Sequence, residues 1–309
     1  MTLVAEAPSI EEIRAAQSRL SGLALRTPLI RLNYPDTPTN IHLKLESLQP
    51  IGVFKIRGFG NVIKSTDAHD LRHGVYTAST GSGGYALAWL ARRLNIPATV
   101  LMPDTAPEGK CASIRQMGAE IKVMSYVDWW DIICQQGSTA EKGLYIDPVR
   151  NSGAIAGNAT IGLEILDDLP NVDTIVVPFG GGGVSCGIAS AVRAIKPDTR
   201  VLAAECETST PFTSALEAGQ IVDVKHEPSF ISGIGGLSVL PEMWPLASNL
   251  LDGSVVSSLQ AVSEAIRILF ECNRVVAEGA GATALAGALS LKASGPIVCV
   301  ITGGNIDKS

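Results

Sequence analysis

The sequence lacks the runs of charge and apolarity that mark several classes of protein. No cluster of Lys and Arg occurs among its 309 residues, and the formal net charge is −6, which argues against nucleic acid as the main partner. No stretch of about 18 residues is both apolar and uncharged, so we expect no membrane span. The N-terminus has no basic segment followed by an apolar core, so we expect no signal peptide.

The six cysteines are scattered singly, and no Cys-x-x-Cys pair indicates a zinc site or a redox centre. Cys186, Cys206 and Cys299 lie within apolar runs, which is typical of thiols in a core. This cysteine usage favours a reducing compartment, and we therefore expect a cytoplasmic protein.

What the sequence does contain is a regular alternation of short apolar runs and helical patterns. The apolar runs include residues 75–79, 98–103, 174–179 and 296–301. Strand, loop and helix in this order predict βαβ units, and hence an α/β fold of mostly parallel twisted sheets flanked by helices. A break near residues 143–150 predicts two domains. We expect a small domain over residues 49–145 and a large domain made of residues 1–48 and 146–309.

Three glycine-rich loops follow apolar runs, at the carboxyl ends of expected strands where α/β proteins bind ligands. The loop at 180–183 consists of four glycines before a helical pattern and suits a phosphate, although a tight turn would look similar. It is no Walker loop, and Glu205 after the next run only weakly indicates a dinucleotide site. The loop at 79–84 is rich in hydroxyls and suits a carboxylate, unless it is an ordinary capped helix. The third loop, 302–305, begins with a threonine.

Lys55 stands in an otherwise apolar run, residues 51–56, and Arg57 follows two residues later. In an edge strand, Lys55 would extend its ammonium group to water, as lone lysines usually do. If apolar side chains enclosed Lys55 instead, the pKa of its amine would fall, and the neutral amine could form a Schiff base with a carbonyl group.

Together these segments resemble the pyridoxal-phosphate (PLP) enzymes of fold type II, the group similar to the β subunit of tryptophan synthase. Within that group they resemble the branch of threonine and serine dehydratases and serine racemases. The segments that carry the resemblance read RTPLIRL, ESLQPIGVFKIRG, TASTGSGG, IAGNATIGLEIL, VVPFGGGGVSCG, VAEGAGATALAG and VITGGNID. They span nearly the whole chain.

The resemblance implies a role for each loop. Lys55 would form the Schiff base with PLP, Phe54 would lie near the cofactor ring, and Thr302 would face its pyridine nitrogen. Ser82 would stand near the 3-hydroxyl group of the cofactor. The cofactor phosphate would rest on Gly180, Gly181, Gly182 and Gly183. The substrate carboxylate would lie in the loop formed by Ser79, Thr80, Gly81, Ser82 and Gly83.

The sequence departs from the family pattern at several positions. Ser82 and Gly83 stand where the family has Asn and His, which leaves room and removes an amide donor near the cofactor. Glu205 matches the first carboxylate of the family's divalent-cation site, but Pro211 replaces the second, so we expect no metal by that route. Ser232 replaces an Asp in the segment FISGIGG.

The implied activity is PLP-dependent elimination of the β-hydroxyl group from a serine- or threonine-type amino acid, which yields a 2-oxo acid and ammonia. The resemblance also implies a homodimer, with Lys55 and Thr80 as catalytic residues. One alternative is a racemase of serine or aspartate type, with these two residues on opposite faces of the substrate. A second is a non-catalytic protein that binds PLP or another phosphate ligand, and a dinucleotide-dependent oxidoreductase is a distant third.

Overall fold

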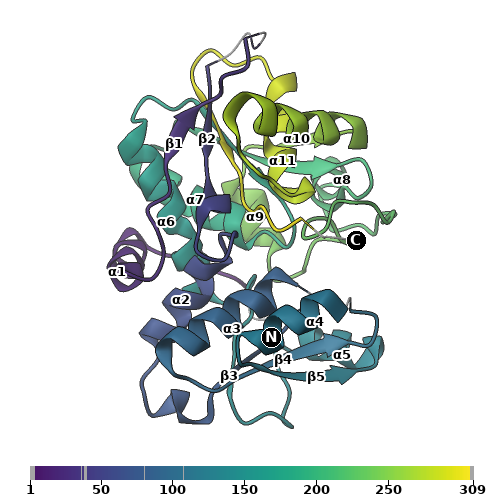
Figure 1. Ribbon diagram of the computed structural model, residues 1–309. Coiled ribbons are helices and arrows are strands. Elements are labelled where there is room, and N and C mark those ends of the chain that lie inside the picture. Colours follow the sequence, from purple (N-terminus) through teal and green to yellow (C-terminus); the bar gives the residue numbers. More distant parts are fainter. Residues whose placement is uncertain (1–3, 36, 38–39, 80, 107, 307–309) are drawn as a thin grey trace.

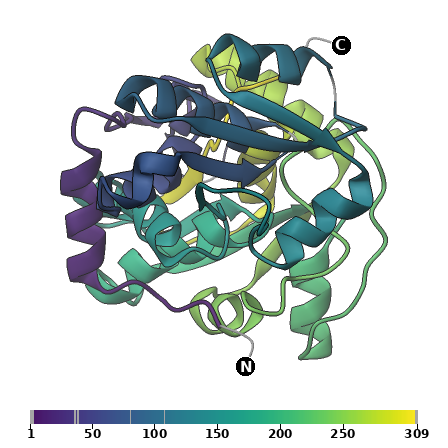
Figure 2. The ribbon, with the colours of Figure 1, turned by 90° about the horizontal axis from the view of Figure 1, so that it is seen from below.

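The computed structural model describes residues 4–35, 37, 40–79, 81–106 and 108–306. The chain forms two lobes, and each is built on one sheet with helices on both of its faces (Figure 1). Helix α1 (Ile10–Leu20) begins with a capping box formed by Ser9 and Glu12. Figure 2 shows α1, in purple, at the outer edge of the molecule, where it packs against α6 and α2.

Within the described residues, the larger lobe contains a six-stranded sheet in the order β1-β2-β10-β7-β8-β9. Strand β1 runs antiparallel to β2, and the other neighbouring pairs are parallel. The strands are β1 (Leu29–Arg31), β2 (Ile41–Lys44), β7 (Thr174–Pro178), β8 (Arg200–Cys206), β9 (Ser254–Ser257) and β10 (Ile297–Val300). The helices of this lobe are α6 (Ser152–Asp168), α7 (Gly183–Ile195), α8 (Pro211–Ala218), α9 (Trp244–Leu250), α10 (Leu259–Asn273) and α11 (Gly279–Ser290).

The smaller lobe contains a parallel sheet of four strands, counted over the same part of the chain, in the order β5-β4-β3-β6. Its strands are β3 (Val75–Ala78), β4 (Ala98–Pro103), β5 (Glu120–Met124) and β6 (Leu144–Tyr145). Its helices are η2 (Asp70–His73), α3 (Ser82–Leu94), α4 (Glu108–Gln116) and α5 (Tyr126–Cys134). Two further helices, η1 (Glu46–Leu48) and α2 (Lys55–Ser65), follow β2. The α/β fold with mostly parallel sheets is therefore confirmed.

Alternate residues of the central strands face opposite layers of helices. In β7, Ile175 and Val177 pack in the core with α7, whereas Val176 packs in the core with α10 and α11. Burial on both faces explains why these strands are continuous apolar runs rather than alternating ones. No helix in the described part of the chain is long and apolar enough to cross a membrane.

The edge-strand interpretation of the segment around Lys55 is wrong. Residues 51–54 form a turn in which Gly52 has a φ of +72°, and Lys55 is the first residue of α2. In a helix, residues two positions apart point to different sides. Arg57 therefore lies away from Lys55, and not beside it as an extended chain would place it.

Candidate active site

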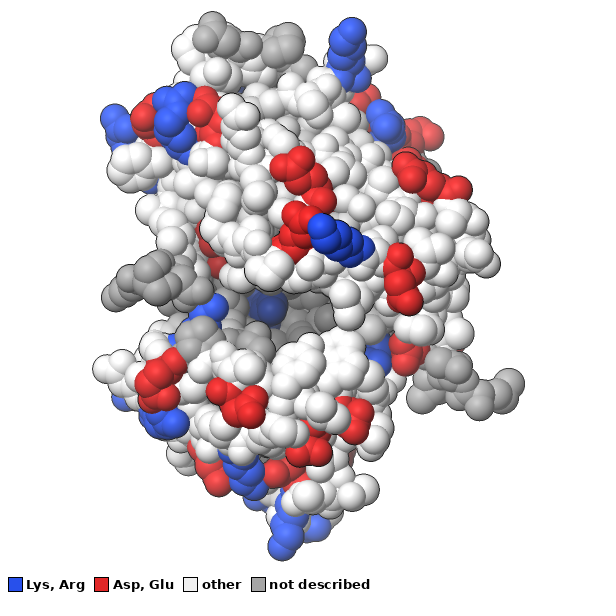
Figure 3. All heavy atoms as spheres, turned by 90° about the vertical axis from the view of Figure 1, so that its right-hand side faces the viewer, with Lys and Arg blue, Asp and Glu red and all other residues white. Residues whose placement is uncertain are grey.

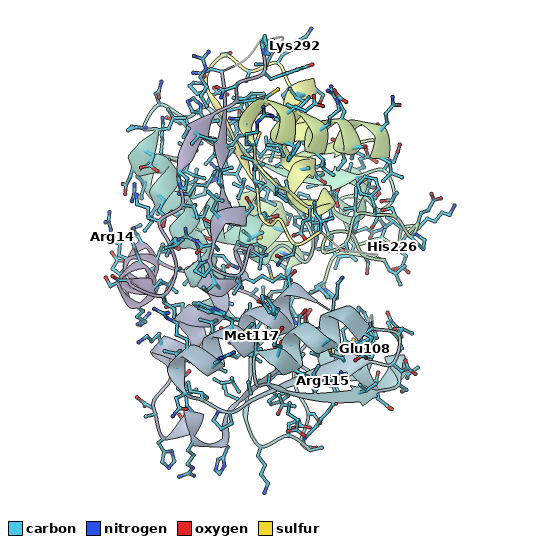
Figure 4. The ribbon with its side chains drawn as sticks, viewed as in Figure 1. Arg14, Glu108, Arg115, Met117, His226 and Lys292 are labelled. Atoms are coloured by element: carbon cyan, nitrogen blue, oxygen red, sulfur yellow. The ribbon has the colours of Figure 1, made fainter. Side chains whose placement is uncertain are left out.

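A cavity of ≈ 810 Å³ lies between the two lobes. Figure 3 shows it as a hollow with a Lys or Arg side chain visible inside. Figure 4 labels Glu108, at the start of α4, on the lower lobe and His226, in the loop after α8, on the upper lobe. The sequence-predicted residues that line the cavity are Phe54, Lys55, Ser79, Gly81, Ser82, Gly180, Gly181, Gly182, Gly183, Ser232 and Thr302. Thr80 lies outside the described residues.

Lys55 occupies the first turn of α2 and lines the cavity. The preceding residues are fixed to the end of β10, because Val53 pairs with Gly303 and the Phe54 N–H group donates to the Thr302 carbonyl at 3.0 Å. Burial lowers the pKa of the Lys55 amine, and the Glu278 carboxylate raises it by less, so the net shift is downward. The positive end of the α2 dipole acts in the same direction. Lys55 therefore has the environment of a nucleophilic amine.

The four-glycine loop joins β7 to α7 and is packed so closely that larger residues would not fit. A Cβ atom on Gly181 would lie 2.7 Å from a methyl carbon of Val149, and one on Gly180 would lie 2.9 Å from the Gly233 carbonyl oxygen. Gly182 has a φ of +94° and precedes the first turn of α7. The backbone N–H groups of this turn are thus open to a ligand in the cavity, as in anion sites at helix starts.

The hydroxyl-rich loop joins β3 to α3 on the opposite side of the cavity. Ser79 and Ser82 line the cavity, and the Gly81 N–H group donates to the Ser79 hydroxyl at 3.4 Å. Gly83 is buried behind the loop, where a Cβ atom would lie 2.8 Å from the Ser79 hydroxyl oxygen. Ser79 therefore fills the space beside Gly83.

Thr302 follows β10 and is buried against the cavity wall. Beside it, the Glu278 N–H group donates to the Gly303 carbonyl at 3.0 Å. A Cβ atom on Gly303 would lie 2.2 Å from Oε1 of Glu278, so glycine at this position makes space for the carboxylate. The negative charge of Glu278 raises the pKa of Lys55, against the larger effect of burial.

Four helices begin at the cavity without a side-chain cap in the described structure. They are α2, α3, α7 and α11, which start at Lys55, Ser82, Gly183 and Gly279. Helices α1, α5, α6 and α10, which begin elsewhere, are capped by Ser or Asn side chains, whereas α9, which also begins elsewhere, has no side-chain cap. Uncapped first turns direct free N–H groups and positive dipole ends toward the cavity. The cavity therefore suits a ligand with more than one anionic group.

Sequence reasoning missed several polar residues of the cavity, namely Tyr85, Lys110, Ser113, Glu278 and Asn305. Glutamate is not a typical N-cap residue, so Glu278 gave no local signal before the helix that follows it. Asn305 belongs to the third glycine-rich loop, whereas Tyr85, Lys110 and Ser113 lie in helices at positions that carry no pattern of their own.

The residues around Glu205 do not fit a divalent cation. Its buried carboxylate accepts hydrogen bonds from the N–H groups of Phe212 and Thr213, at 2.9 and 2.8 Å, and from the Thr213 hydroxyl. These donors belong to the first turn of α8, which begins at Pro211. Among the described residues, no group of three or more His, Cys, Asp or Glu side chains could hold a metal ion. Glu205 is thus used as a helix cap.

Comparison with known proteins places this site in a family. A family model described as pyridoxal-phosphate dependent enzyme matches residues 20–303. The chain is 33% identical to the L-threonine ammonia-lyase of Thermotoga maritima, over 97% of this chain and 76% of that protein. It is also 33% identical to the catabolic L-threonine dehydratase of Escherichia coli, over 97% of this chain and 94% of that protein. Maize serine racemase superposes with a TM-score of 0.91 at 30% identity, over 98% of this chain and 95% of the other. The chain therefore belongs to the family of pyridoxal-phosphate dependent enzymes.

Proposed function

We propose that the protein is a PLP-dependent ammonia-lyase that converts a serine- or threonine-type amino acid into a 2-oxo acid and ammonia by eliminating its β-hydroxyl group. One observation carries the proposal. Lys55, an amine of lowered pKa, opens into the same cavity as the four-glycine loop and the hydroxyl-rich loop. The relatives that are named threonine ammonia-lyase and threonine dehydratase support the same reaction.

The residues of the cavity fit the cofactor. In our proposal Lys55 binds PLP covalently, Phe54 lies beside the ring, Ser82 stands near the 3-hydroxyl group and Thr302 faces the pyridine nitrogen. The phosphate rests on the N–H groups of the loop at 180–183. When bound, the cofactor supplies an electron sink for the α-carbon of the substrate.

The remaining steps belong to groups of this chain. The substrate carboxylate rests at the uncapped start of α3, against Ser79, Gly81 and Ser82. The substrate amine would displace the Lys55 amine from the cofactor, and the freed Lys55 amine would accept the α-proton of the substrate. Burial lowers the pKa of this amine, which favours the neutral form that this step needs. The β-hydroxyl group would leave as water with a proton from a neighbouring acid, and the enamine that remains would take up water to give the 2-oxo acid and ammonia. The Thr302 hydroxyl, unlike a carboxylate, does not hold the pyridine nitrogen protonated, and this favours prompt elimination over a long-lived carbanion.

The likeness to maize serine racemase supports a second candidate, an amino-acid racemase of serine or aspartate type. Racemisation needs a second acid–base group on the opposite face of the substrate from Lys55, and Thr80 has the position in sequence for this role. Incubation in deuterated water followed by chiral analysis separates the two candidates. A lyase forms 2-oxo acid and ammonia, whereas a racemase forms the α-deuterated enantiomer.

The test of the lyase proposal is ammonia and 2-oxo acid release from a panel of L- and D-hydroxy amino acids. Lys55→Ala should abolish this activity, and borohydride reduction of the wild type followed by peptide mapping should find the cofactor on Lys55. Lys64→Ala is a matched control, because Lys64 lies exposed in the last turn of the same helix. An active Lys55→Ala variant would refute the proposal.

We further propose how the site is assembled. Residues 1–48 and 146–309 form a large domain that holds the phosphate and the pyridine nitrogen, and residues 49–145 form a small domain that holds the substrate carboxylate. The described cysteines are all free, in keeping with a cytoplasmic protein. By resemblance to the family the protein is a homodimer, which light scattering on the purified protein tests directly.

A further inference from the structure

A buried network of four charged side chains lies on the far side of α2 from the cavity. Lys44 ends β2, Glu46 begins η1, Arg57 lies in the first turn of α2, and Glu164 lies in α6. Each of the four is at least nine-tenths buried. The network contains two positive and two negative charges, so the charges balance within it.

Arg57 is the centre of this network, because its guanidinium group binds both carboxylates. Its Nε and Nη2 atoms donate to the two oxygens of Glu46, each at 2.8 Å. Its Nη1 and Nη2 atoms donate to the two oxygens of Glu164 at 2.7 and 2.9 Å. The Thr160 hydroxyl and the Leu25 carbonyl accept further bonds at 3.0 Å. Such paired planar contacts fix an orientation as well as a distance.

Lys44 and Thr27 complete the network. The Lys44 ammonium donates to Glu164 and to the Thr27 carbonyl, both at 2.6 Å, and the Thr27 hydroxyl donates to Glu46 at 2.6 Å. Burial opposes the ionisation of Glu46, but the adjacent Arg57 guanidinium outweighs it and holds the pKa of that carboxyl below its ordinary value. Burial lowers the pKa of the Lys44 ammonium, and the adjacent Glu164 carboxylate opposes this shift.

The backbone around Arg57 is also packed against α6. A Cβ atom on Gly157 would lie 2.4 Å from the Arg57 carbonyl oxygen, and one on Gly58 would lie 3.2 Å from the Ala154 carbonyl oxygen. Small residues thus let the two helices approach closely at the turn that carries Lys55. Since this turn has no side-chain cap, its position depends on these contacts and on the bond from Phe54 to Thr302.

We infer that Arg57 is a positioning residue: its buried network with Glu46, Glu164 and Lys44 fixes the first turn of α2 and so aims the Lys55 amine into the cavity. The inference rests on the proposed role of Lys55. Arg57 does not touch the cavity itself, and in the helix it points away from Lys55. It acts through the backbone that the two residues share.

Stability alone does not account for the network. Well-packed apolar side chains in place of a buried ion pair often leave a protein equally stable or more stable, because removing charges from water carries a large penalty. What a set of directed ionic bonds adds is a defined geometry. The place where geometry matters most on α2 is the reactive amine, since misplacement of a catalytic group by about 1 Å can reduce a rate by about 100-fold.

The experiment compares Arg57→Lys and Glu46→Gln with wild type and with Leu269→Ala. Leu269 is fully buried in α10, in a different core from α2, so this control lowers stability without touching the network. The first readout is the rate at which acetic anhydride modifies Lys55 in the apo protein, followed by mass spectrometry across a range of pH. The second is the fraction of cofactor that borohydride fixes on Lys55, and the third is kcat separately from KM.

We expect Arg57→Lys and Glu46→Gln to shift the pH profile of Lys55 modification and to lower kcat by about 10- to 100-fold, with a smaller change in KM. Leu269→Ala should lower the unfolding temperature and leave the Lys55 profile as in wild type. If Arg57→Lys does not fold, Thr160→Val removes one acceptor of Arg57 with little change in volume, and a smaller shift in the same direction is expected. Network variants that match Leu269→Ala in all three readouts would overturn the inference. A wild-type protein without cofactor on Lys55 would instead overturn the proposed function.

Discussion

At the scale of single residues, Gly181 packs the four-glycine loop against Val149. Its missing Cβ atom would meet two methyl carbons of Val149 at 2.7 and 2.8 Å. Gly181→Ala therefore displaces the loop, with the penalty of about 1–3 kcal/mol that is typical of overpacking. We expect PLP to bind about 10- to 100-fold more weakly, as measured by fluorescence titration of the apo protein.

Two further variants test this explanation for Gly181. Gly181→Ala combined with Val149→Ala removes the opposing methyl groups and should recover most of the affinity. Gly236→Ala is the control, because a Cβ atom there would meet no atom nearer than 3.6 Å. If the double variant binds PLP no better than Gly181→Ala, the close contact is not the cause.

The lowered pKa of Lys55 makes a prediction about stability against pH. Burial is the main cause of the shift below the ordinary value of 10.5. Between the lowered pKa and 10.5, the unfolded chain binds one proton more than the folded chain at this position, so the free energy of unfolding of the apo protein rises with pH. Lys55→Met removes this contribution. The excess of its free energy of unfolding over that of the wild type should be largest below the lowered pKa and should disappear toward pH 10.5. Urea unfolding of both apo proteins over this pH range measures the difference. A difference in free energy of unfolding that stays constant with pH would contradict the prediction.

The sequence indicated only some residues of the site, for a physical reason. Lys55 and the glycines at 180–183 stand out because a cation among apolar residues and four residues without Cβ atoms are unusual in their own segments. Lys110 and Glu278 reach the cavity only because separate helices begin at its wall. Proximity of that kind is produced by the fold and leaves no local pattern.

At the scale of elements, the first turn of α8 provides a test of how Glu205 is used. Its buried carboxylate accepts three hydrogen bonds from Phe212 and Thr213. Glu205→Gln removes the charge and replaces one accepting oxygen with an NH2 group, which cannot accept a hydrogen bond from α8. We therefore expect a loss of about 1–3 kcal/mol of unfolding free energy. The control Glu264→Gln, at an exposed pair with Arg267, should change it by less than about 0.5 kcal/mol.

The same element makes a prediction about metal ions. Because the donors of α8 occupy the Glu205 carboxylate, Mg²⁺ or Ca²⁺ should leave the unfolding temperature and the activity of the wild type unchanged, and so should EDTA. Thermal unfolding with and without each addition is the measurement. A loss of activity or a lower unfolding temperature in EDTA would show that a cation takes part.

The residue ranges of helices and strands were predicted well where several residues repeat one pattern. They were predicted poorly where a turn determines the residue at which an element begins. The run in β4 matches its predicted range, 98–103, because buried apolar residues define it. The start of α2 was harder to locate, because the apolar run around Lys55 continues from a turn into a helix. The positive φ of Gly52 marks the change, and a glycine alone does not reveal which φ it adopts.

At the scale of the whole molecule, the alternation of strands and helices was enough to predict mostly parallel sheets, because parallel strands require crossover helices. It did not predict how the lobes meet. Their junction depends on the network around Arg57 and on the close crossing of α2 and α6, both of which join segments about 100 residues apart. The cavity is the space that this junction leaves between the sheets.

A ligand held by both lobes should stabilise both, and this gives a prediction for the molecule as a whole. PLP at about 100 times its Kd should raise the free energy of unfolding of the apo protein by about 2.7 kcal/mol. Pyridoxal, which has the aldehyde but no phosphate, can reach Lys55 but not use the loop at 180–183, so its effect at equal concentration should be smaller. Calorimetry measures the shift, and hydrogen exchange should show added protection in β4 of the smaller lobe as well as β7 of the larger. Equal effects of the two ligands, or protection confined to one lobe, would mean that the phosphate loop and the lysine do not hold one ligand between them.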